Sequence, residues 1–191
     1  MKLILASASP RRRELLGHLG VPFEVKPADL DESLIPGEHA TTYVERLARA
    51  KANAGGEGLI LAADTSVVID DEVLGKPGTD AKLGAEMLRR LSGRAHEVMT
   101  GVAVRSPSGV QSRVVISQVH FRELTESEIA WYVSTGEGAD KAGGYALQGR
   151  AGAFITSVVG SPSNVIGLPL AETVELLRAA GLALPMDRRE D

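Results

Sequence analysis

The chain has 191 residues, a formal net charge of -4, no cysteine, 43% hydrophobic residues and 4% aromatic residues. This length fits one domain that buries about 70% of its unfolded surface. The lack of cysteine excludes a disulfide framework, a thiolate metal site and a cysteine nucleophile. The interspersed charges exclude the overall basic field of a protein that coats nucleic acid or an anionic membrane. An anionic ligand would therefore need a locally basic site.

No apolar stretch reaches the roughly 18–20 residues that span a bilayer. The apolar run at the N-terminus, LILA within MKLILASASPRRR, is too short for the core of a secretory signal. We therefore expect a soluble, cytoplasmic protein with a single domain over residues 1–185. The last residues, 186–191, are polar and charged, and we expect a flexible C-terminal tail there.

Hydrophobic periodicity and turn residues predict the elements in chain order. The first half is predicted to contain a strand at 2–6, a helix that begins at Pro10 with Ser9 as its N-cap, an extended segment at 21–25, a helix at 41–54 and a strand at 59–63. The second half is predicted to contain a hairpin of 67–69 and 72–74, a helix at 80–91, a hairpin of 97–105 and 110–122, a helix with a capping box at Thr125 and Glu128, a strand at 154–159 and a helix at 170–180. Alternating strands and helices followed by a long hairpin predict one α/β domain with a mixed sheet.

Three arginines, at 11–13, follow the first strand-to-helix turn. A helix N-terminus favours anions, and arginine adds to its positive charge instead of offsetting it. The arginines therefore indicate that a negative ligand such as phosphate binds there. The alternative is a capped surface helix whose arginines contact solvated acids.

Asp64 follows the apolar strand at 59–63, where α/β proteins place their ligands. It is a candidate metal ligand or general base, although aspartates after strands are also common turn and cap residues. Lys76 lies between a glycine and a proline and could contact a phosphate, although a solvated turn lysine is commoner.

Weaker signals come from an acidic loop, a helix end and a glycine-rich segment. The acids at 29, 31 and 32 could hold a divalent cation or could simply be solvated. Lys51 near the end of a helix complements the helix dipole. In the segment 141–149, Tyr145 and Gln148 could stack on a base and bind its edge, or the segment could be a plain loop. The histidines have no metal-ligand spacing, and the common phosphate-binding loops are absent from the sequence.

Taken together, these segments resemble the Maf family of nucleoside triphosphate pyrophosphatases. The matching segments, in family order, are LASASPRRRELL at 5–16, DES at 31–33, YVERLARAKA at 43–52, LAADTSVVID at 61–70, GKP at 75–77, MLRRLSG at 87–93, VHFRELTESEIAWYV at 119–133, DKAGGYALQG at 140–149 and VIGLPL at 165–170. They extend over nearly the whole chain, so the resemblance is far more specific than any single motif.

The resemblance implies a mixed, twisted sheet flanked by helices, as in Maf and inosine-triphosphatase-like proteins, with a ligand cleft at the strand ends. It implies hydrolysis between the α and β phosphates to give a monophosphate and pyrophosphate. The implied cofactor is a divalent metal cation, Mg²⁺, Mn²⁺ or Co²⁺, and the implied assembly is a homodimer.

The resemblance also implies roles for particular residues. These are catalysis for Asp64, Glu32 and Lys76, substrate binding for Ser7, Arg12 and Lys51, and substrate specificity for Arg11, Thr65 and Gln148. Asp64 looks like the proton acceptor for the attacking water, and Glu32 and Asp64 look like the metal ligands. The residues at 11, 65 and 148 match the dTTP/UTP branch, whereas the 7-methyl-GTP branch has Trp, Gln and Glu. A neutral amide can both donate to and accept from a uracil or thymine edge.

We therefore expect a dTTP/UTP pyrophosphatase that removes surplus or modified pyrimidine triphosphates and has a role in the arrest of cell division. One alternative is a broad-specificity or 7-methyl-GTP pyrophosphatase. Another is a non-catalytic nucleotide-binding regulator of septum formation. A third is a sugar-nucleotide transferase.

Overall fold

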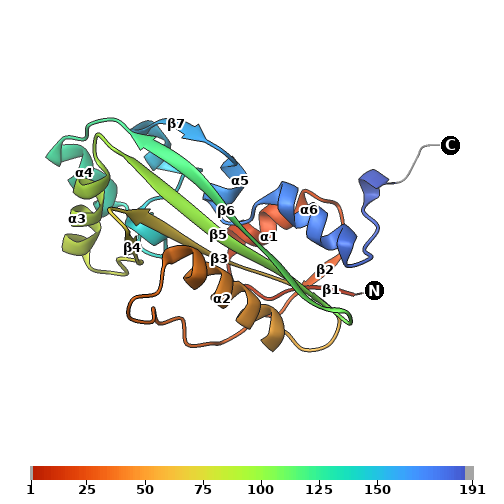
Figure 1. Ribbon diagram of the computed structural model, residues 1–191. Helices are drawn as coiled ribbons and strands as arrows, with labels where there is room; N and C mark the ends of the chain where they lie inside the picture. The colour runs from red at the N-terminus through yellow and green to blue at the C-terminus, as the bar shows by residue number, and fades with distance from the viewer. Residues whose placement is uncertain (1, 188–191) are drawn as a thin grey trace. The chain divides into compact units, whose positions relative to one another are not determined.

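The strands of the computed structural model, which describes residues 2–187, belong to a seven-stranded sheet (Figure 1). Its order is β2–β1–β3–β5–β6–β7, and β4 pairs with β3. The strands are β1 (Leu3–Leu5), β2 (Phe23–Val25), β3 (Leu59–Ile69), β4 (Glu72–Leu74), β5 (Ala95–Ser106), β6 (Gly109–Phe121) and β7 (Ile155–Val159). β1 is parallel to β2 and β3, whereas β4 is antiparallel to β3 and β7 to β6. The predicted α/β class with a mixed sheet is confirmed.

The helices agree with the sequence pattern at most positions. They are α1 (Pro10–Gly17), α2 (Ala40–Ala54), α3 (Ala81–Leu91), α4 (Glu126–Ser134), α5 (Pro162–Ile166) and α6 (Leu170–Ala179), with 3₁₀ turns η1 (Ala142–Gly144), η2 (Arg150–Phe154) and η3 (Pro185–Asp187). The pattern did not predict α5 or the 3₁₀ turns, which are too short to show a helical period. Within residues 2–187, no helix is long and apolar enough to cross a membrane. Of the predicted tail, 186 and 187 belong to η3, and 188–191 lie outside the described residues.

Side-chain caps fix where several helices begin. Ser9 Oγ accepts the Arg12 N–H at the start of α1, where Pro10 occupies the first turn. Thr125 and Glu128 form the predicted capping box of α4, in which each side chain accepts the backbone N–H of the other residue. Such a cap typically contributes about 1 kcal/mol.

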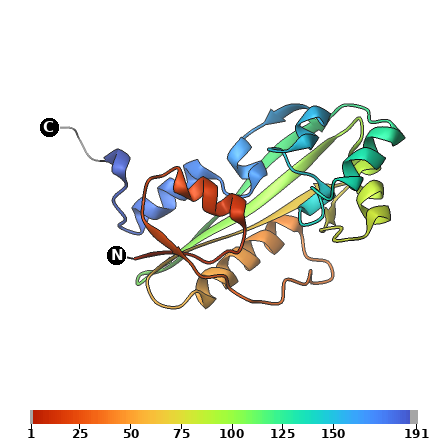
Figure 2. The same ribbon diagram turned by 180° about the vertical axis from the view of Figure 1, so that it is seen from behind.

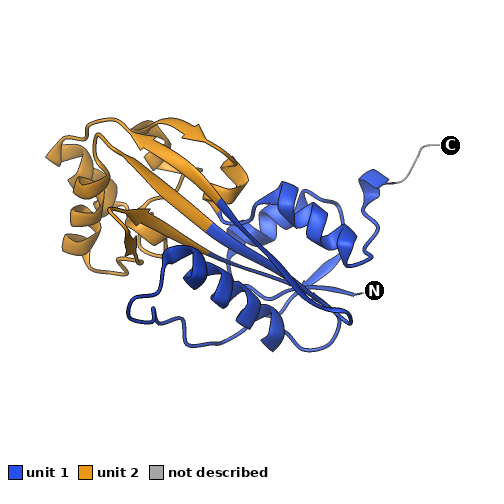
Figure 3. Ribbon diagram, in the orientation of Figure 1, with its two compact units in different colours: residues 1–64, 100–115, 167–191 blue, residues 65–99, 116–166 orange. Residues whose placement is uncertain are grey.

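Contacts within the chain group into two compact units (Figure 3). Unit 1 contains residues 1–64, 100–115 and 167–191, and unit 2 contains residues 65–99 and 116–166. Each unit includes helices and parts of the long strands, and each has buried apolar residues of its own.

In unit 1, α2 packs on one face of the strands. Buried small and branched residues form this contact: Ile4, Ala6, Ala48, Ala52, Ile60, Ala62 and Ala103. At Gly101 of β5, a Cβ would lie 2.2 Å from the Val44 carbonyl oxygen of α2. Only glycine therefore allows α2 to approach β5 this closely. Figures 1 and 2 show α1 and α6 side by side, across these strands from α2.

The prediction that a strand ends at Asp64 is wrong, because β3 continues without interruption to Ile69. All of its residues are buried except the half-buried Thr65. A strand that is buried on both sides lacks the alternation of polar and apolar residues that marks a half-exposed strand. Asp64 and Thr65 therefore resemble the end of a strand in the sequence, although they lie inside β3. The parallel neighbour β1 ends at Leu5, opposite Leu61. Asp64 therefore lies beyond the carboxyl end of β1 while remaining inside β3.

The predicted hairpin after this point is confirmed. β3 and β4 pair antiparallel, with Val67 opposite Leu74. The connecting Asp70 and Asp71 both have positive φ angles, 54° and 62°. These values are typical of a type I′ turn, which matches the twist of a two-residue hairpin.

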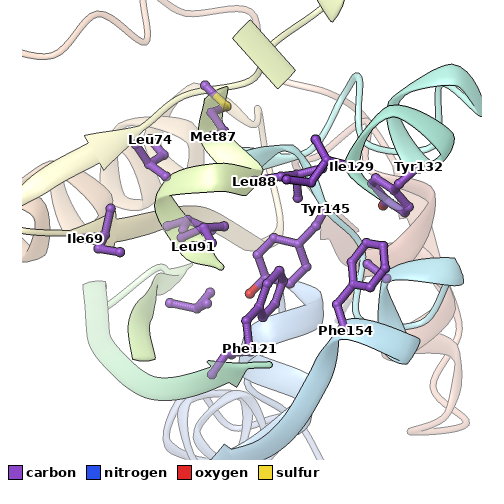
Figure 4. Packing of buried hydrophobic residues seen from close by; sticks show 14 residues of the cluster. Ile69, Leu74, Met87, Leu88, Leu91, Phe121, Ile129, Tyr132, Tyr145 and Phe154 are labelled. Carbon is purple, nitrogen blue, oxygen red and sulfur yellow. The ribbon is translucent and has the colours of Figure 1, made fainter. Parts of the chain in front are cut away.

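In unit 2, side chains from the strands, α3, α4 and the glycine-rich segment form one core (Figure 4). Its labelled members are Ile69, Leu74, Met87, Leu88, Leu91, Phe121, Ile129, Tyr132, Tyr145 and Phe154. Helix α3 packs against α4 and against η1. This core fixes the glycine-rich segment relative to α4.

Candidate active site

A buried lysine lies between two carboxylates in unit 1. Lys51 Nζ lies 2.8 Å from Asp64 Oδ1 and 2.5 Å from Glu32 Oε1. The side chains of Lys51 and Asp64 are 7% and 11% exposed, whereas that of Glu32 is 44% exposed. Lys51 thus does more than complement the dipole at the end of α2, because it neutralises a carboxylate that is buried in the sheet.

Strand geometry explains why these groups meet. Side chains alternate along a strand, so Asp64 points to the same face of β3 as Ile60 and Ala62. Both of these residues pack against α2. Lys51 in the last turn of α2 therefore faces Asp64 across the helix–sheet contact.

Glu32 comes from a loop that is fastened to the same helix. The Tyr43 hydroxyl of α2 donates to the Glu32 carbonyl at 2.8 Å. Arg46 donates to the Ser33 carbonyl at 3.1 Å. Burial, with the charges of Asp64 and Glu32, raises the pKa of Tyr43, so its hydroxyl stays protonated and can donate. Helix α2 thus supplies the lysine and also holds the loop that brings the second carboxylate.

The loop between β1 and α1 brings Ser7 and Arg12 together. Arg12 Nη1 donates to Ser7 Oγ at 3.2 Å, and Arg12 Nε donates to the Gly167 carbonyl at 2.8 Å. Ser7 Oγ also accepts the Ser9 N–H at 3.3 Å. The arginine is therefore held in one orientation by backbone and hydroxyl groups.

Arg12 also lies within the electrostatic reach of the two carboxylates. Burial lowers the pKa of Arg12, and the charges of Asp64 and Glu32 partly oppose that effect. The arginine side chain stays charged nevertheless, because the ordinary pKa of a guanidinium group lies far above neutral pH. Arg11, in the same first turn, is half-buried and contributes a further positive charge near Arg12. Unit 1 thus gathers Ser7, Arg11, Arg12, Glu32, Lys51 and Asp64 of the predicted site.

Unit 2 contains the other three predicted residues, Thr65, Lys76 and Gln148. Thr65 follows Asp64 directly in β3, so its side chain points to the opposite face of the strand. Lys76 is exposed in the turn after β4. Gln148 is exposed in the turn that precedes η2.

The turn of Lys76 is joined to the glycine-rich segment. The Gly143 N–H donates to the Gly75 carbonyl at 3.0 Å, and the Gly78 N–H donates to the Ala139 carbonyl at 2.9 Å. These bonds hold the segments GKP and DKAGGYALQG side by side, although they lie far apart in the sequence.

Asp31 and His96 have partners outside these groups. Asp31 Oδ1 accepts hydrogen bonds from the backbone and the hydroxyl of Ser33, so it shapes its own loop. His96 is buried and its Nε2 lies 2.7 Å from the Tyr145 hydroxyl. Burial lowers the pKa of His96 to about 4, so its ring is neutral near pH 7. Over residues 2–187, no group of three or more His, Cys, Asp or Glu side chains is arranged to hold a metal ion.

Several residues that shape this site were not singled out from the sequence. Gly167 holds Arg12, and Tyr43 and Arg46 hold the loop of Glu32. Tyr43 and Arg46 are spaced three apart, on one face of the predicted helix, which was the available signal. The carbonyl of Gly167 leaves no mark in a sequence, because every residue has one.

The sequence and the fold were compared with those of known proteins. The model of the Maf family, described as Maf-like protein, matches residues 2–180. The dTTP/UTP pyrophosphatase of Anaeromyxobacter sp. (strain Fw109-5) is 59% identical over 191 residues, which cover 97% of this chain and 93% of that protein. The dTTP/UTP pyrophosphatase of Myxococcus xanthus (strain DK1622) is 52% identical over 187 residues, covering 96% and 94%. A solved structure, that of the Staphylococcus aureus Ham1 protein, matches with a TM-score of 0.46 and 13% identity over 66% of this chain and 73% of that chain.

Proposed function

This chain belongs to the Maf family, and we propose that it hydrolyses dTTP and UTP to the nucleoside monophosphate and pyrophosphate. Relatives that are 59% and 52% identical over nearly the whole chain carry the name dTTP/UTP pyrophosphatase. Arg11, Thr65 and Gln148 are the residues that the resemblance associates with this branch. Both observations support a pyrimidine triphosphate as the substrate.

The observation that carries the proposal is the cluster of Asp64, Lys51 and Glu32. Lys51 pairs with Asp64 Oδ1 at 2.8 Å, and an aspartate carboxylate is a group that can accept a proton from water. Ser7, in the loop before α1, and Arg12, in the first turn of α1, belong to the same unit and can bind phosphate oxygens. The cluster therefore combines a base with groups that neutralise an anionic substrate.

In the proposed reaction, a water molecule attacks the α-phosphorus. A bond forms between the water oxygen and the α-phosphorus, and the bond from that phosphorus to the bridging oxygen breaks. The electron pair of the broken bond leaves with pyrophosphate, and the proton of the water goes to Asp64. Lys51 occupies Oδ1 of Asp64, so we assign the proton to Oδ2.

The phosphates need positive charge on several sides, because hydrolysis of a triphosphate depends on charge neutralisation more than on covalent help from the protein. We assign Ser7, Arg12 and Lys51 to binding the triphosphate. Lys76 is assigned to the catalytic set, as a point charge on a phosphate oxygen. Arginine is suited to bidentate contact with two phosphate oxygens.

Asp64 and Glu32 also fit the requirements of a divalent metal. Both carboxylates reach one cation, the Lys51 ammonium, within 2.8 Å, so their oxygens converge on a shared positive charge. Hard cations such as Mg²⁺ and Mn²⁺ prefer oxygen ligands and are often held by one or two carboxylates together with substrate phosphates. When bound, such an ion supplies charge neutralisation at the phosphate oxygens.

Gln148 is assigned to recognition of the base. Its amide can donate to a carbonyl and accept from the ring N–H of uracil or thymine. It is exposed at the tip of a turn, where it is accessible to a ligand. A carboxylate at this position would instead favour the cationic ring of 7-methylguanine.

A panel of triphosphates with varied metal tests the proposal. Pyrophosphate release is measured from dTTP, UTP, CTP, GTP and 7-methyl-GTP, each with Mg²⁺, Mn²⁺ or Co²⁺. We expect the highest kcat/KM for dTTP and UTP and loss of turnover when a chelator removes the metal. Preference for 7-methyl-GTP would overturn the specificity, and absence of pyrophosphate release from every triphosphate would overturn the activity.

We include in the proposal a cytoplasmic location and a homodimer, of which the dimer is what the family resemblance implies. Sedimentation velocity separates a dimer from the monomer of 20.1 kDa. A monomer at micromolar concentration would contradict this part.

A further inference from the structure

Gln148 lies in a tight turn of the glycine-rich segment. The Gly149 N–H donates to the Ala146 carbonyl at 3.1 Å, which closes the turn around Leu147 and Gln148. The Gln148 side chain is exposed, so packing does not fix its position. Its orientation therefore depends on how the two ends of the turn are held.

Two side chains hold these ends. The Ala146 N–H, at the start of the turn, donates to the Tyr132 hydroxyl at 3.2 Å. The Arg150 N–H, just after the turn, donates to Glu137 Oε1 at 2.8 Å. The Tyr132 hydroxyl itself donates to the same Glu137 oxygen at 3.0 Å. One tyrosine–glutamate pair thus joins both ends of the turn that carries Gln148.

Glu137 can reach the turn only because residue 149 is glycine. A Cβ at Gly149 would lie 2.1 Å from Glu137 Oε1 and 2.5 Å from its carboxyl carbon. The backbone at Gly149 is extended, with φ -111° and ψ -153°, so the glycine serves close approach and not an unusual conformation. Arg150 Nη1 lies 3.4 Å from Glu137 Oε2, but its side chain is mostly exposed, so this pair adds little.

Tyr132 is held rigidly by the core of unit 2. The residue is 1% exposed, and its ring packs edge-to-face on Phe154, with the ring centroids 5.5 Å apart. Figure 4 shows the two rings next to each other in the core of unit 2. Burial, with the charge of Glu137, raises the pKa of Tyr132, so the hydroxyl remains a donor to the carboxylate at neutral pH. The turn is thereby fastened to α4.

We propose that Tyr132 and Glu137 are positioning residues for base recognition, which fix the turn so that the Gln148 amide meets the base in one orientation. This inference rests on the proposed function, in which Gln148 contacts the base. An amide reads a base edge only when its donor and its acceptor are both within hydrogen-bond distance. A turn that is already ordered also avoids the entropy cost of ordering it on binding.

The test compares Tyr132→Phe, Glu137→Ala and Gln148→Ala in steady-state hydrolysis of UTP and GTP by the full chain. Each variant should raise the KM for UTP about 5- to 10-fold, the size expected when one hydrogen bond to a ligand is lost. The effect on kcat should be smaller, and the ratio of kcat/KM for UTP to that for GTP should fall. Glu137→Gln keeps an acceptor oxygen and should recover most of the loss.

Double variants separate positioning from a general loss of stability. In the Gln148→Ala background, Tyr132→Phe and Glu137→Ala should change the KM for UTP less than about twofold further, because no amide is left to position. Thr125→Ala is the matched control. It removes the N-cap of α4 and should lower the unfolding temperature, yet it should not change the UTP to GTP ratio.

Full additivity of Tyr132→Phe and Gln148→Ala would overturn the positioning role. An equal fall of the ratio in Thr125→Ala would overturn it as well, because loss of stability would then explain the effect. If Gln148→Ala leaves the ratio unchanged, both the role of Gln148 in the proposed function and its positioning by Tyr132 and Glu137 are wrong. If Gln148→Ala lowers the ratio but neither Tyr132→Phe nor Glu137→Ala does, only the positioning role is wrong.

Discussion

Replacing Lys51 by methionine removes the cation that two carboxylates share. Methionine keeps the apolar stem but removes the ammonium from Oδ1 of Asp64, a carboxylate whose side chain is 11% exposed. Removing one partner of a buried ion pair costs about 3–5 kcal/mol. The Glu32 side chain is 44% exposed and can turn to water, so we assign the cost to Asp64 and expect the lower end, about 3 kcal/mol. The variant should still fold, because domains of this kind have about 5–15 kcal/mol of stability.

Urea unfolding at neutral pH measures this cost. Adding Asp64→Asn to Lys51→Met should recover about 2 kcal/mol, because a neutral amide needs no counter-charge. Arg49→Met is the control, since Arg49 is an exposed cation of the same helix that donates to Ser112 Oγ at 2.9 Å. It should stay within about 0.5 kcal/mol of the parent. A cost below about 1 kcal/mol for Lys51→Met, or no recovery in the double variant, would refute the reasoning.

Three further changes test other parts of the structure. Gly149→Ala places a Cβ 2.1 Å from Glu137 Oε1 and should raise the KM for UTP about 5-fold, with no additional rise in the Glu137→Ala background; an unchanged KM would contradict the close contact. Hydrogen bonds from Arg122 lower the pKa of Glu128 from the ordinary value of 4.5 to about 2 in the folded protein. The ionised Glu128 side chain therefore stabilises the fold fully above about pH 5, and this stabilisation is lost as the pH falls toward about 2. The difference in unfolding temperature between the parent and Glu128→Gln should therefore shrink from about pH 5 to about pH 2, and a constant difference would argue against this ion pair. Gly101→Ala places a Cβ 2.2 Å from a main-chain carbonyl of α2 and should cost at least about 2 kcal/mol in urea unfolding, whereas a neutral effect would show that α2 can shift freely.

Local signals in the sequence predicted most of the elements. The Ser9–Pro10 pair marked the start of α1, and the Thr125–Glu128 pair marked the capping box of α4. Both depend on residues within one helical turn, so the physical cause lies inside a short window of sequence.

The continuation of β3 through Asp64 could not be predicted in this way. A charged residue in a buried strand is costly unless a partner neutralises it, and the partner, Lys51, belongs to a helix that precedes the strand. The sequence shows both residues but not their contact. For the same reason Lys51 looked like a helix-end lysine and not the centre of a cluster.

In the candidate site too, the sequence indicates some residues and leaves others undetected. Residue types and the family resemblance indicated Ser7, Arg12, Glu32 and Asp64, and the structure places them together in unit 1. The residues that orient this site, such as Gly167, act through backbone groups or across the fold. Contacts of this kind depend on tertiary structure and leave no local pattern.

The central claim is that Asp64 accepts the proton of the attacking water. The most direct test measures both the turnover of the Asp64→Asn variant and the affinity of that variant for UTP. Asparagine keeps the shape of the side chain but cannot act as a base. Pyrophosphate release should fall at least about 100-fold, while the Kd for UTP, measured by calorimetry, should change little. Equal turnover in the variant and the parent would contradict the assignment.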